Sequence, residues 1–153
     1  MEKKVATLCF IHKDSRILLG MKKRGMGVGF WSGFGGKVKE GETIEEAAKR
    51  EVKEEAGIVP LNLEKRGVLK FQFEGRHEIL EVHVFSCSNF EGEIRETEEM
   101  KPGWFKLEEI PFEKMWPGDK HWLPLLLEGK NFEGKIFYST DKKVIDYRIR
   151  EIE

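Results

Sequence analysis

The segment from Gly36 to Ile58 constrains this chain more than any other stretch, because it places a dense set of carboxylates between two glycine turns. Glu51, Glu54 and Glu55 stand at positions i, i+3 and i+4, so a helix presents them on one face. Like charges at this spacing destabilise a helix by about 0.2–0.5 kcal/mol per pair. A divalent cation would turn this repulsion into coordination, since Mg²⁺ takes oxygen ligands. The pattern therefore indicates a metal-binding helix; the alternative is a solvated Glu/Lys surface helix.

Local signals in the sequence also predict where this helix begins and ends. Thr43 and Glu46 have the spacing of a capping box, which predicts a helix that starts at Ile44. Gly57 ends it and Pro60 prevents its continuation. The carboxylates therefore belong to the second half of a short helix.

A glycine-rich loop precedes the helix. The thirteen residues from Gly25 to Lys37 include six glycines, which excludes a helix and suits a backbone that approaches a ligand closely. Basic side chains lie beside it, and we expect Lys22 and Lys37 to contact phosphate oxygens. The alternative is a flexible loop with solvated lysines, but its position directly before the carboxylate helix favours a ligand site.

Alternating apolar residues predict strands in the rest of the chain. The segment 5–11 is apolar on both faces, which is typical of a central strand. The segments 64–74 and 78–88 form a predicted antiparallel hairpin, and 135–139 with 144–150 form a closing one. Two shorter strands are expected over 16–20 and 104–107, a helical turn or loop over 108–112 and a helix over 121–127. We therefore predict a single mixed α/β domain over residues 1–153.

Composition narrows the class of function. The net charge is −1 and neither half is strongly basic, which argues against generic binding of duplex nucleic acid. Cys9 and Cys87 lie in apolar strand-like runs and are expected to be buried thiols in a reducing compartment. No apolar run approaches the length of a membrane span, and there is no signal peptide. We expect a cytoplasmic protein that does not bind membranes and is a monomer.

The carboxylate segment carries a complete family signature. The chain resembles the Nudix hydrolases at Gly36, Glu42, Arg50, Glu51, Val52, Glu54, Glu55, Gly57 and Ile58. The resemblance implies an α/β/α sandwich with a mixed sheet. It also implies hydrolysis of a diphosphate linkage attached to a further moiety, with divalent metal ions as cofactors.

Roles for individual residues follow from this resemblance. The metal ligands would be the Gly35 carbonyl and the carboxylates of Glu51, Glu54, Glu55 and Glu99, which hold Mg²⁺, with Mn²⁺ as an alternative. Arg50 would fix a neighbouring motif glutamate by a charge-assisted pair, and a simple surface ion pair is the alternative. Glu46 and Arg50 also stand at i and i+4, so we expect them to form an ion pair on the helix. Either Glu55 or Glu99 would act as the general base, and the sequence does not decide between them.

The resemblance extends beyond the signature. The segments Leu18–Gly25, Gly33–Val38, Val82–Phe85, Met115–Pro117 and Trp122–Leu127 are similar to the Nudix subfamily that hydrolyses 8-oxo-dGTP and related oxidised purine triphosphates to monophosphate and pyrophosphate. Matching positions imply that the substrate contacts Gly35 and Gly36 and that a base pocket is formed by Thr7, Met26, Ser32, Phe34, Phe71, Leu80, Met100, Trp116, Asp119, Trp122 and Tyr138. For each aromatic residue the alternative is plain core packing.

Two positions depart from that subfamily. It has an asparagine where this chain has Ser32, and a pair of aspartates where this chain has Gly118 and Asp119. One ionised carboxylate accepts the two adjacent donors of a guanine-type edge. We therefore expect guanine-like bases to be retained as substrates and oxidised adenine bases to be turned over less well.

Two other functions remain open at this stage. The same scaffold can act on a methylated guanine nucleotide, a diadenosine polyphosphate, ADP-ribose or the 5′ end of an RNA. A non-catalytic Nudix-fold binding module is the third possibility, but such modules commonly lose motif glutamates, and Glu51, Glu54 and Glu55 are all present here.

Overall fold

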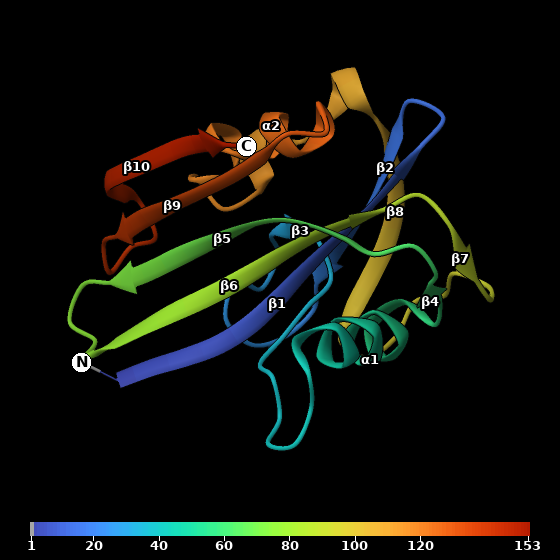
Figure 1. Ribbon diagram of the computed structural model, residues 1–153, viewed down its shortest axis with the longest axis horizontal. Coiled ribbons are helices and arrows are strands. Elements are labelled where there is room, and N and C mark those ends of the chain that lie inside the picture. The colour runs from blue at the N-terminus through green and yellow to red at the C-terminus, as the bar shows by residue number, and fades with distance from the viewer. Residues whose placement is uncertain (1) are drawn as a thin grey trace.

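The computed structural model describes residues 2–153 and is built around one strongly curved mixed sheet (Figure 1). The sheet has eight strands, seven of them in the order β10-β9-β5-β6-β1-β2-β3, with β8 paired to β2. Their bounds are β1 (Glu2–Lys13), β2 (Arg16–Lys22), β3 (Trp31–Ser32), β5 (Glu64–Phe73), β6 (Glu78–Cys87), β8 (Met100–Lys106), β9 (Asn131–Tyr138) and β10 (Val144–Ile152). A separate small sheet pairs β4 (Val59–Pro60) with β7 (Phe90–Glu91).

Parallel and antiparallel pairs alternate across the middle of the sheet. β1 runs parallel to β6 and β5 runs parallel to β9, whereas β1–β2, β5–β6 and β9–β10 are antiparallel. β1 lies between β6 and β2, which confirms its predicted central position. Both expected hairpins form, and the β1–β2 turn uses positive φ at Asp14 and Ser15, the geometry of a tight two-residue hairpin.

Helix α1 (Ile44–Ala56) has the predicted boundaries. The Thr43 side chain accepts a hydrogen bond from the Glu46 N–H, and the Glu46 side chain accepts one from the Thr43 N–H. At the other end Gly57 adopts φ 80° and donates to the Lys53 carbonyl. These two caps fix where the helix begins and ends.

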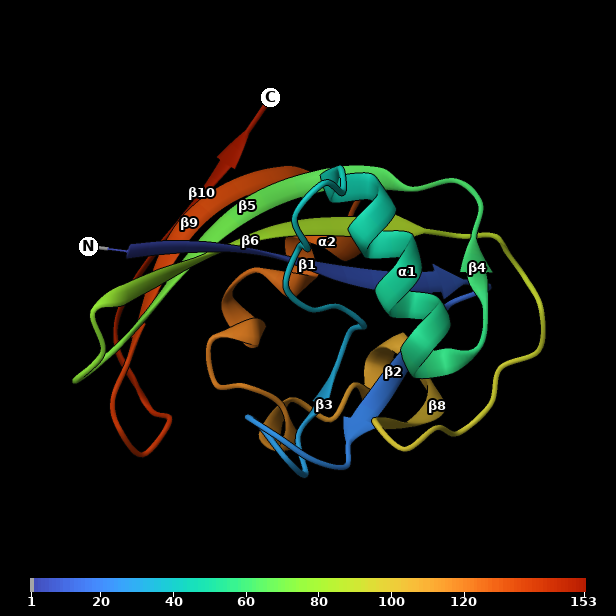
Figure 2. The same cartoon turned by 90° about the horizontal axis from the view of Figure 1, so that it is seen from below.

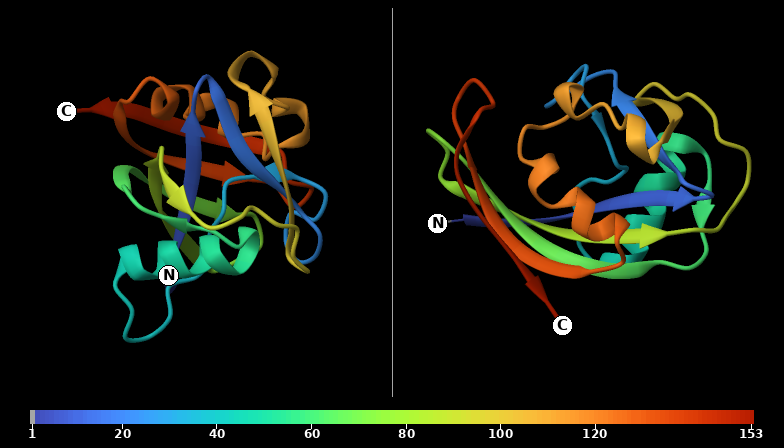
Figure 3. Two further views of the ribbon diagram at one scale, coloured as in Figure 1. Left: turned by 90° about the vertical axis from the view of Figure 1, so that its right-hand side faces the viewer. Right: turned by 90° about the horizontal axis from the view of Figure 1, so that it is seen from above.

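Helices cover both faces of the sheet, as expected for an α/β/α sandwich. Helix α1 lies across one face and the segment that contains α2 (Leu123–Leu127) lies on the other (Figures 2 and 3). On the α1 side the buried cluster includes Cys9, Phe34, Val52 and Cys87. On the α2 side Trp122, Leu123 and Leu126 pack with β1, β5, β6 and β9. The two buried cysteines are free thiols.

Two parts of the chain differ from the sequence prediction, and a third, the helical turn or loop expected over 108–112, is divided more finely than predicted. The helix expected over 121–127 is divided into the 3₁₀ helix η3 (Asp119–His121) and α2, because Trp122 leaves helical geometry between them. The 108–112 segment forms two 3₁₀ helices, η1 (Leu107–Glu109) and η2 (Phe112–Lys114). β8 starts at Met100 because it pairs with β2 through Pro102 and Gly103, residues that give no strand signal. Within residues 2–153, no helix is long and apolar enough to cross a membrane.

Candidate functional site

The Gly35–Gly36 turn brings helix α1 against the centre of the sheet. The Gly36 carbonyl accepts from the Thr7 N–H of β1 at 2.9 Å, and Phe34 exchanges hydrogen bonds with Cys9. This segment runs so close to β1 that a Cβ on Gly35 would lie 1.8 Å from the Thr7 carbonyl oxygen. Glycine is therefore required here by the close backbone approach.

Two of the predicted carboxylates meet at this turn. The Glu55 carboxylate accepts a hydrogen bond from the Gly35 N–H at 2.8 Å. The Glu51 carboxylate packs on Gly36, where a Cβ would lie 2.6 Å from its Cδ. The Gly35 carbonyl accepts no hydrogen bond in the described part of the chain, as expected for a carbonyl that is available to a cation.

Arg50 organises the carboxylates around it. Its guanidinium group donates to Glu42 at 2.6 and 2.9 Å, to Glu51 at 2.7 Å and to the Lys37 carbonyl at 3.2 Å. The Glu54 carboxylate lies 3.4 Å from the Arg50 guanidinium group, as its i,i+4 partner. The pairing holds the pKa of Glu42 down at about 2, through its hydrogen bond to Arg50 first and the Lys39 N–H second. The expected ion pair with Glu46 is wrong, because the Glu46 carboxylate is engaged in the helix cap.

Glu55 differs from the other carboxylates because it is buried. Its side chain is inside the protein, and this burial raises its pKa to about 8. The Gly35 N–H opposes the shift, while the nearby charge of Glu51 adds to it. A carboxyl with a raised pKa in a cleft is a common marker of a functional site.

The remaining predicted ligands are more open. The Glu54 side chain is 52% exposed. Glu99 accepts from the Arg24 Nε at 3.1 Å, and this pairing lowers its pKa. In residues 2–153 no three acidic, histidine or cysteine side chains converge closely enough to hold a metal ion. The donor set nevertheless fits a hard cation, because Glu51, Glu55 and a free carbonyl surround one turn and consist only of oxygen donors.

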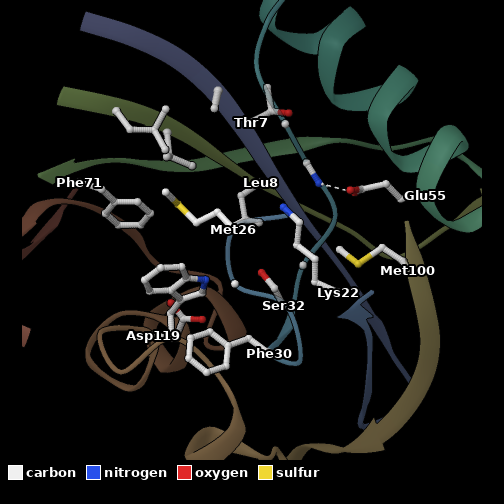
Figure 4. A pocket seen from close by; sticks show the side chains of 18 of the residues that line it. Thr7, Leu8, Lys22, Met26, Phe30, Ser32, Glu55, Phe71, Met100 and Asp119 are labelled. Atoms are coloured by element: carbon white, nitrogen blue, oxygen red, sulfur yellow. Dashed lines mark hydrogen bonds between the residues drawn. The ribbon is translucent and has the colours of Figure 1, made fainter. Parts of the chain in front are cut away.

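A cavity of about 180 Å³, partly open to solvent, extends from Glu55 into the α2 side of the molecule. Glu55 and Met100 lie at one end and Phe71 and Asp119 at the other, with the Lys22 ammonium group between them (Figure 4). The structure brings together most of the predicted substrate residues on this lining: Thr7, Lys22, Met26, Ser32, Gly35, Gly36, Phe71, Leu80, Met100, Trp116, Asp119 and Tyr138.

The far end of the cavity combines aromatic rings with one acid. The Trp116 ring contacts Tyr138 at 5.0 Å and Phe30 at 5.3 Å between centroids. Asp119 is only 3% exposed, and burial raises its pKa to about 8. The Trp122 indole N–H opposes this shift, although it makes no hydrogen bond of normal geometry. The acid is thus mainly neutral at pH 7, whereas the sequence argument treated it as ionised.

Thr7 adds a second sign that this cavity takes a polar ligand. Its hydroxyl group is buried and has no hydrogen-bond partner in the described residues. Buried polar groups are nearly always paired, so an orphaned hydroxyl on a cavity wall points to a missing partner.

Three of the predicted substrate residues lie elsewhere. Phe34 and Trp122 are fully buried in the two core clusters and are not among the lining residues. Lys37 is also outside the lining and contributes its carbonyl to Arg50. Sequence reasoning missed a further group of lining residues, namely Ala6, Leu8, Gly27, Phe30, Gly33, Phe73 and Val82. The shared strand face of Phe71 and Phe73 was the one signal that could have identified Phe73.

Comparison with known proteins agrees with this geometry. Residues 2–126 match the NUDIX domain. Two curated proteins named oxidized purine nucleoside triphosphate hydrolase are similar over almost their whole length. The mouse protein is 48% identical over 96% of this chain and 94% of its own, and the zebrafish protein is 46% identical over 98% and 96%. The crystal structure of the MutT protein from Bacillus halodurans superposes with a TM-score of 0.86 at 30% identity, covering 95% of this chain and 97% of the other.

Proposed function

The chain belongs to the NUDIX family, and from that premise we propose that it hydrolyses oxidised purine nucleoside triphosphates of the 8-oxo-dGTP type to the monophosphate and pyrophosphate. One observation carries the proposal: a single cavity joins the Glu55 carboxylate to the pocket formed by Trp116 and Asp119. A purine at the aromatic end places its phosphates toward the carboxylate helix. The names of the mouse and zebrafish relatives support the same substrate class.

The acidic end of the cavity is suited to a divalent cation, for which we propose Mg²⁺. Glu51, Glu54, Glu55, Glu99 and the Gly35 carbonyl would hold it, and it would neutralise phosphate charge and lower the pKa of a bound water. Arg50 keeps the Glu51 carboxylate in place through its 2.7 Å hydrogen bond. Lys22 faces the cavity and would contact phosphate oxygens.

Glu55 and Glu99 both remain candidates for the general base, and their surroundings differ. Glu55 has a raised pKa near the metal end, whereas Glu99 has a lowered pKa and is held by Arg24. A base with a pKa close to the working pH removes a proton most effectively. A bound cation would lower the pKa of Glu55, so Glu55 and Glu99 stay equal candidates for the base.

The site of action and the assembly state are part of the proposal. The buried free thiols Cys9 and Cys87 are consistent with a reducing compartment, so we place the reaction in the cytoplasm. We propose that the protein acts as a monomer.

The test is a substrate panel assayed for pyrophosphate and for orthophosphate. It includes 8-oxo-dGTP, dGTP, 2-oxo-dATP, a methylated guanine nucleotide, diadenosine polyphosphate, ADP-ribose and 5′-triphosphate RNA. We expect the highest kcat/KM for 8-oxo-dGTP, with pyrophosphate released. Orthophosphate as the main product, or a preference for ADP-ribose or RNA, would contradict the proposal.

A paired variant tests the metal assignment. Glu54→Gln removes one exposed oxygen anion from α1 and should abolish turnover with Mg²⁺. Glu45→Gln makes the same change on an exposed residue of the same helix that has no role in the site and should leave kcat within about twofold. Equal activity of the two variants would show that Glu54 does not bind the metal.

A further inference from the structure

Gly118 lies in contact with the hydroxyl group of Tyr138. A Cβ at Gly118 would be 2.6 Å from the Tyr138 oxygen and 2.7 Å from Ile136 Cδ1. Gly118 has φ −76°, an ordinary helical value, so its backbone conformation does not require glycine. What excludes a side chain at this position is the Tyr138 hydroxyl group together with the Ile136 side chain, which occupy the volume that an aspartate would need.

The Tyr138 ring cannot easily move out of that volume. It stacks on Phe73 at 5.6 Å with an interplanar angle of 17°, and it meets Trp116 and Phe71 edge-on at 5.0 and 6.0 Å. Its oxygen accepts a hydrogen bond from the Gly118 N–H at 3.2 Å. The hydroxyl proton therefore remains free to be donated to another group.

The hydroxyl group stays protonated across the working pH range. Burial raises the pKa of Tyr138 well above its usual value, and the charge of Asp119 raises it further. Tyr138 and Asp119 both line the cavity, and Asp119 lies close enough to Tyr138 to act on its hydroxyl group electrostatically. One of them can change its protonation state near neutral pH and the other cannot.

We propose that Tyr138 is a specificity-determining residue, whose fixed O–H donor acts with the Asp119 carboxyl to select purines that present an acceptor beside two donors. This inference rests on the proposed function and names the residue pair that sets its base preference. A guanine-type edge has this order: its O6 accepts from Tyr138, and N1–H and N2–H donate to the Asp119 carboxylate, whose ionised form these two donors stabilise. The phenol stands where the related subfamily has a second carboxylate.

The same pair disfavours an adenine-type edge. The exocyclic amino group of 2-oxo-adenine takes the place of O6, so two donors face each other at Tyr138. A donor that loses its partner in a buried site is costly to leave unpaired. A second carboxylate could accept from that amino group, whereas the Tyr138 oxygen already accepts from Gly118 and is a poor acceptor.

The test compares the ratio of kcat/KM for 8-oxo-dGTP and 2-oxo-dATP in wild type, Tyr138→Phe and Tyr147→Phe. Tyr138→Phe removes one oxygen and keeps the stacked ring. We expect its ratio to fall by about tenfold. The variant loses one neutral hydrogen bond to the O6 of 8-oxoguanine, and it no longer places a second donor against the amino group of 2-oxo-adenine. Tyr147→Phe makes the same change in an exposed ring that stacks on His121, and it should keep the wild-type ratio.

An unchanged ratio in active Tyr138→Phe would overturn the inference and leave the proposed function intact. A wild-type protein that hydrolyses neither triphosphate would refute the proposed function instead. Product binding gives a second readout for the same variants. The affinity for 8-oxo-dGMP should fall in Tyr138→Phe and stay unchanged in Tyr147→Phe.

A double variant tests the packing argument directly. Gly118→Asp should lower the unfolding temperature in the wild-type background, because its Cβ meets the Tyr138 oxygen. The same substitution should lower it less in the Tyr138→Phe background and should raise turnover of 2-oxo-dATP there. Equal destabilisation in both backgrounds would show that the hydroxyl group does not exclude a side chain at residue 118.

Discussion

Three glycine-to-alanine substitutions separate the catalytic use of the Gly35–Gly36 turn from its structural use. On Gly36 a new Cβ meets only the end of a flexible side chain, the Glu51 carboxylate, at 2.6 to 2.8 Å. On Gly35 it meets the Thr7 backbone at 1.8 Å. On Gly103 it lies 3.4 Å from the Trp31 ring, an ordinary contact. We expect Gly36→Ala to damage the site and Gly35→Ala to destabilise the fold. Gly103→Ala should change neither.

The expected changes in the free energy of unfolding and in kcat depend on which atoms each new Cβ displaces. Gly36→Ala also restricts the unfolded chain, which stabilises a protein by about 0.4–1 kcal/mol and offsets much of the contact. We expect its free energy of unfolding to stay within about 1 kcal/mol of wild type, while displacement of the Glu51 carboxylate lowers kcat by about 10²-fold. Gly35→Ala should cost about 3 kcal/mol or more, since β1 and the turn must separate.

The assay combines urea unfolding with kcat at saturating Mg²⁺ for the three variants. Gly103→Ala serves as the control for the substitution itself and should match wild type in both measurements. Full activity of Gly36→Ala would refute the view that the Glu51 carboxylate must rest on this turn. A loss of stability as large as that of Gly35→Ala would show that Gly36 has a structural role instead.

The remaining predictions concern the charged groups. Arg50→Lys loses the paired donors to Glu42 and Glu51 and should lower the free energy of unfolding by about 1.5–3 kcal/mol in urea titration, with kcat reduced. The pKa of Asp119 rises from 3.8 to about 8 on folding, so wild type should lose stability relative to Asp119→Asn as the pH rises from 4 to 8, by at most about 1.4 kcal/mol per pH unit; a parallel pH dependence of the two unfolding temperatures would refute this. Arg50→Lys and Tyr138→Phe should have additive effects on the logarithm of kcat/KM. Measurable coupling between them would contradict the view that the two ends of the cavity act independently.

The sequence predicted helix α1 well because its signals are local. Thr43, Glu46 and Gly57 lie within a few residues of the ends that they cap, and no tertiary contact is needed to interpret them. Strands β3, β4 and β7 were missed because two residues are too few to show a period. The start of β9 at Asn131 depends on antiparallel pairing with Ile152 of β10 and, from Phe132 onward, on parallel pairing with β5, and these long-range contacts have no local signature.

The candidate site also has one part that local sequence signals predict and another that depends on contacts between distant residues. The acidic end could be predicted because Glu51, Glu54 and Glu55 fall on one helix. At the base end, aromatic residues were assigned by type alone, and Trp122 is buried in the core. The contact between Gly118 and Tyr138 joins residues twenty positions apart on different elements, so it becomes visible only in the folded chain.

The two ends of the cavity depend on different parts of the structure. The position of Glu51 and Glu55 is set by α1 and by the Gly35–Gly36 turn on β1. The position of Asp119 is set by the segment between η2 and α2, and that of Tyr138 by the end of β9. Within residues 2–153 no hydrogen bond joins Glu51 or Glu55 to Asp119 or Tyr138, and Glu55, Asp119 and Tyr138 line the same cavity. A change at residue 118 can therefore alter which base is bound while the carboxylates that act on the phosphates keep their geometry.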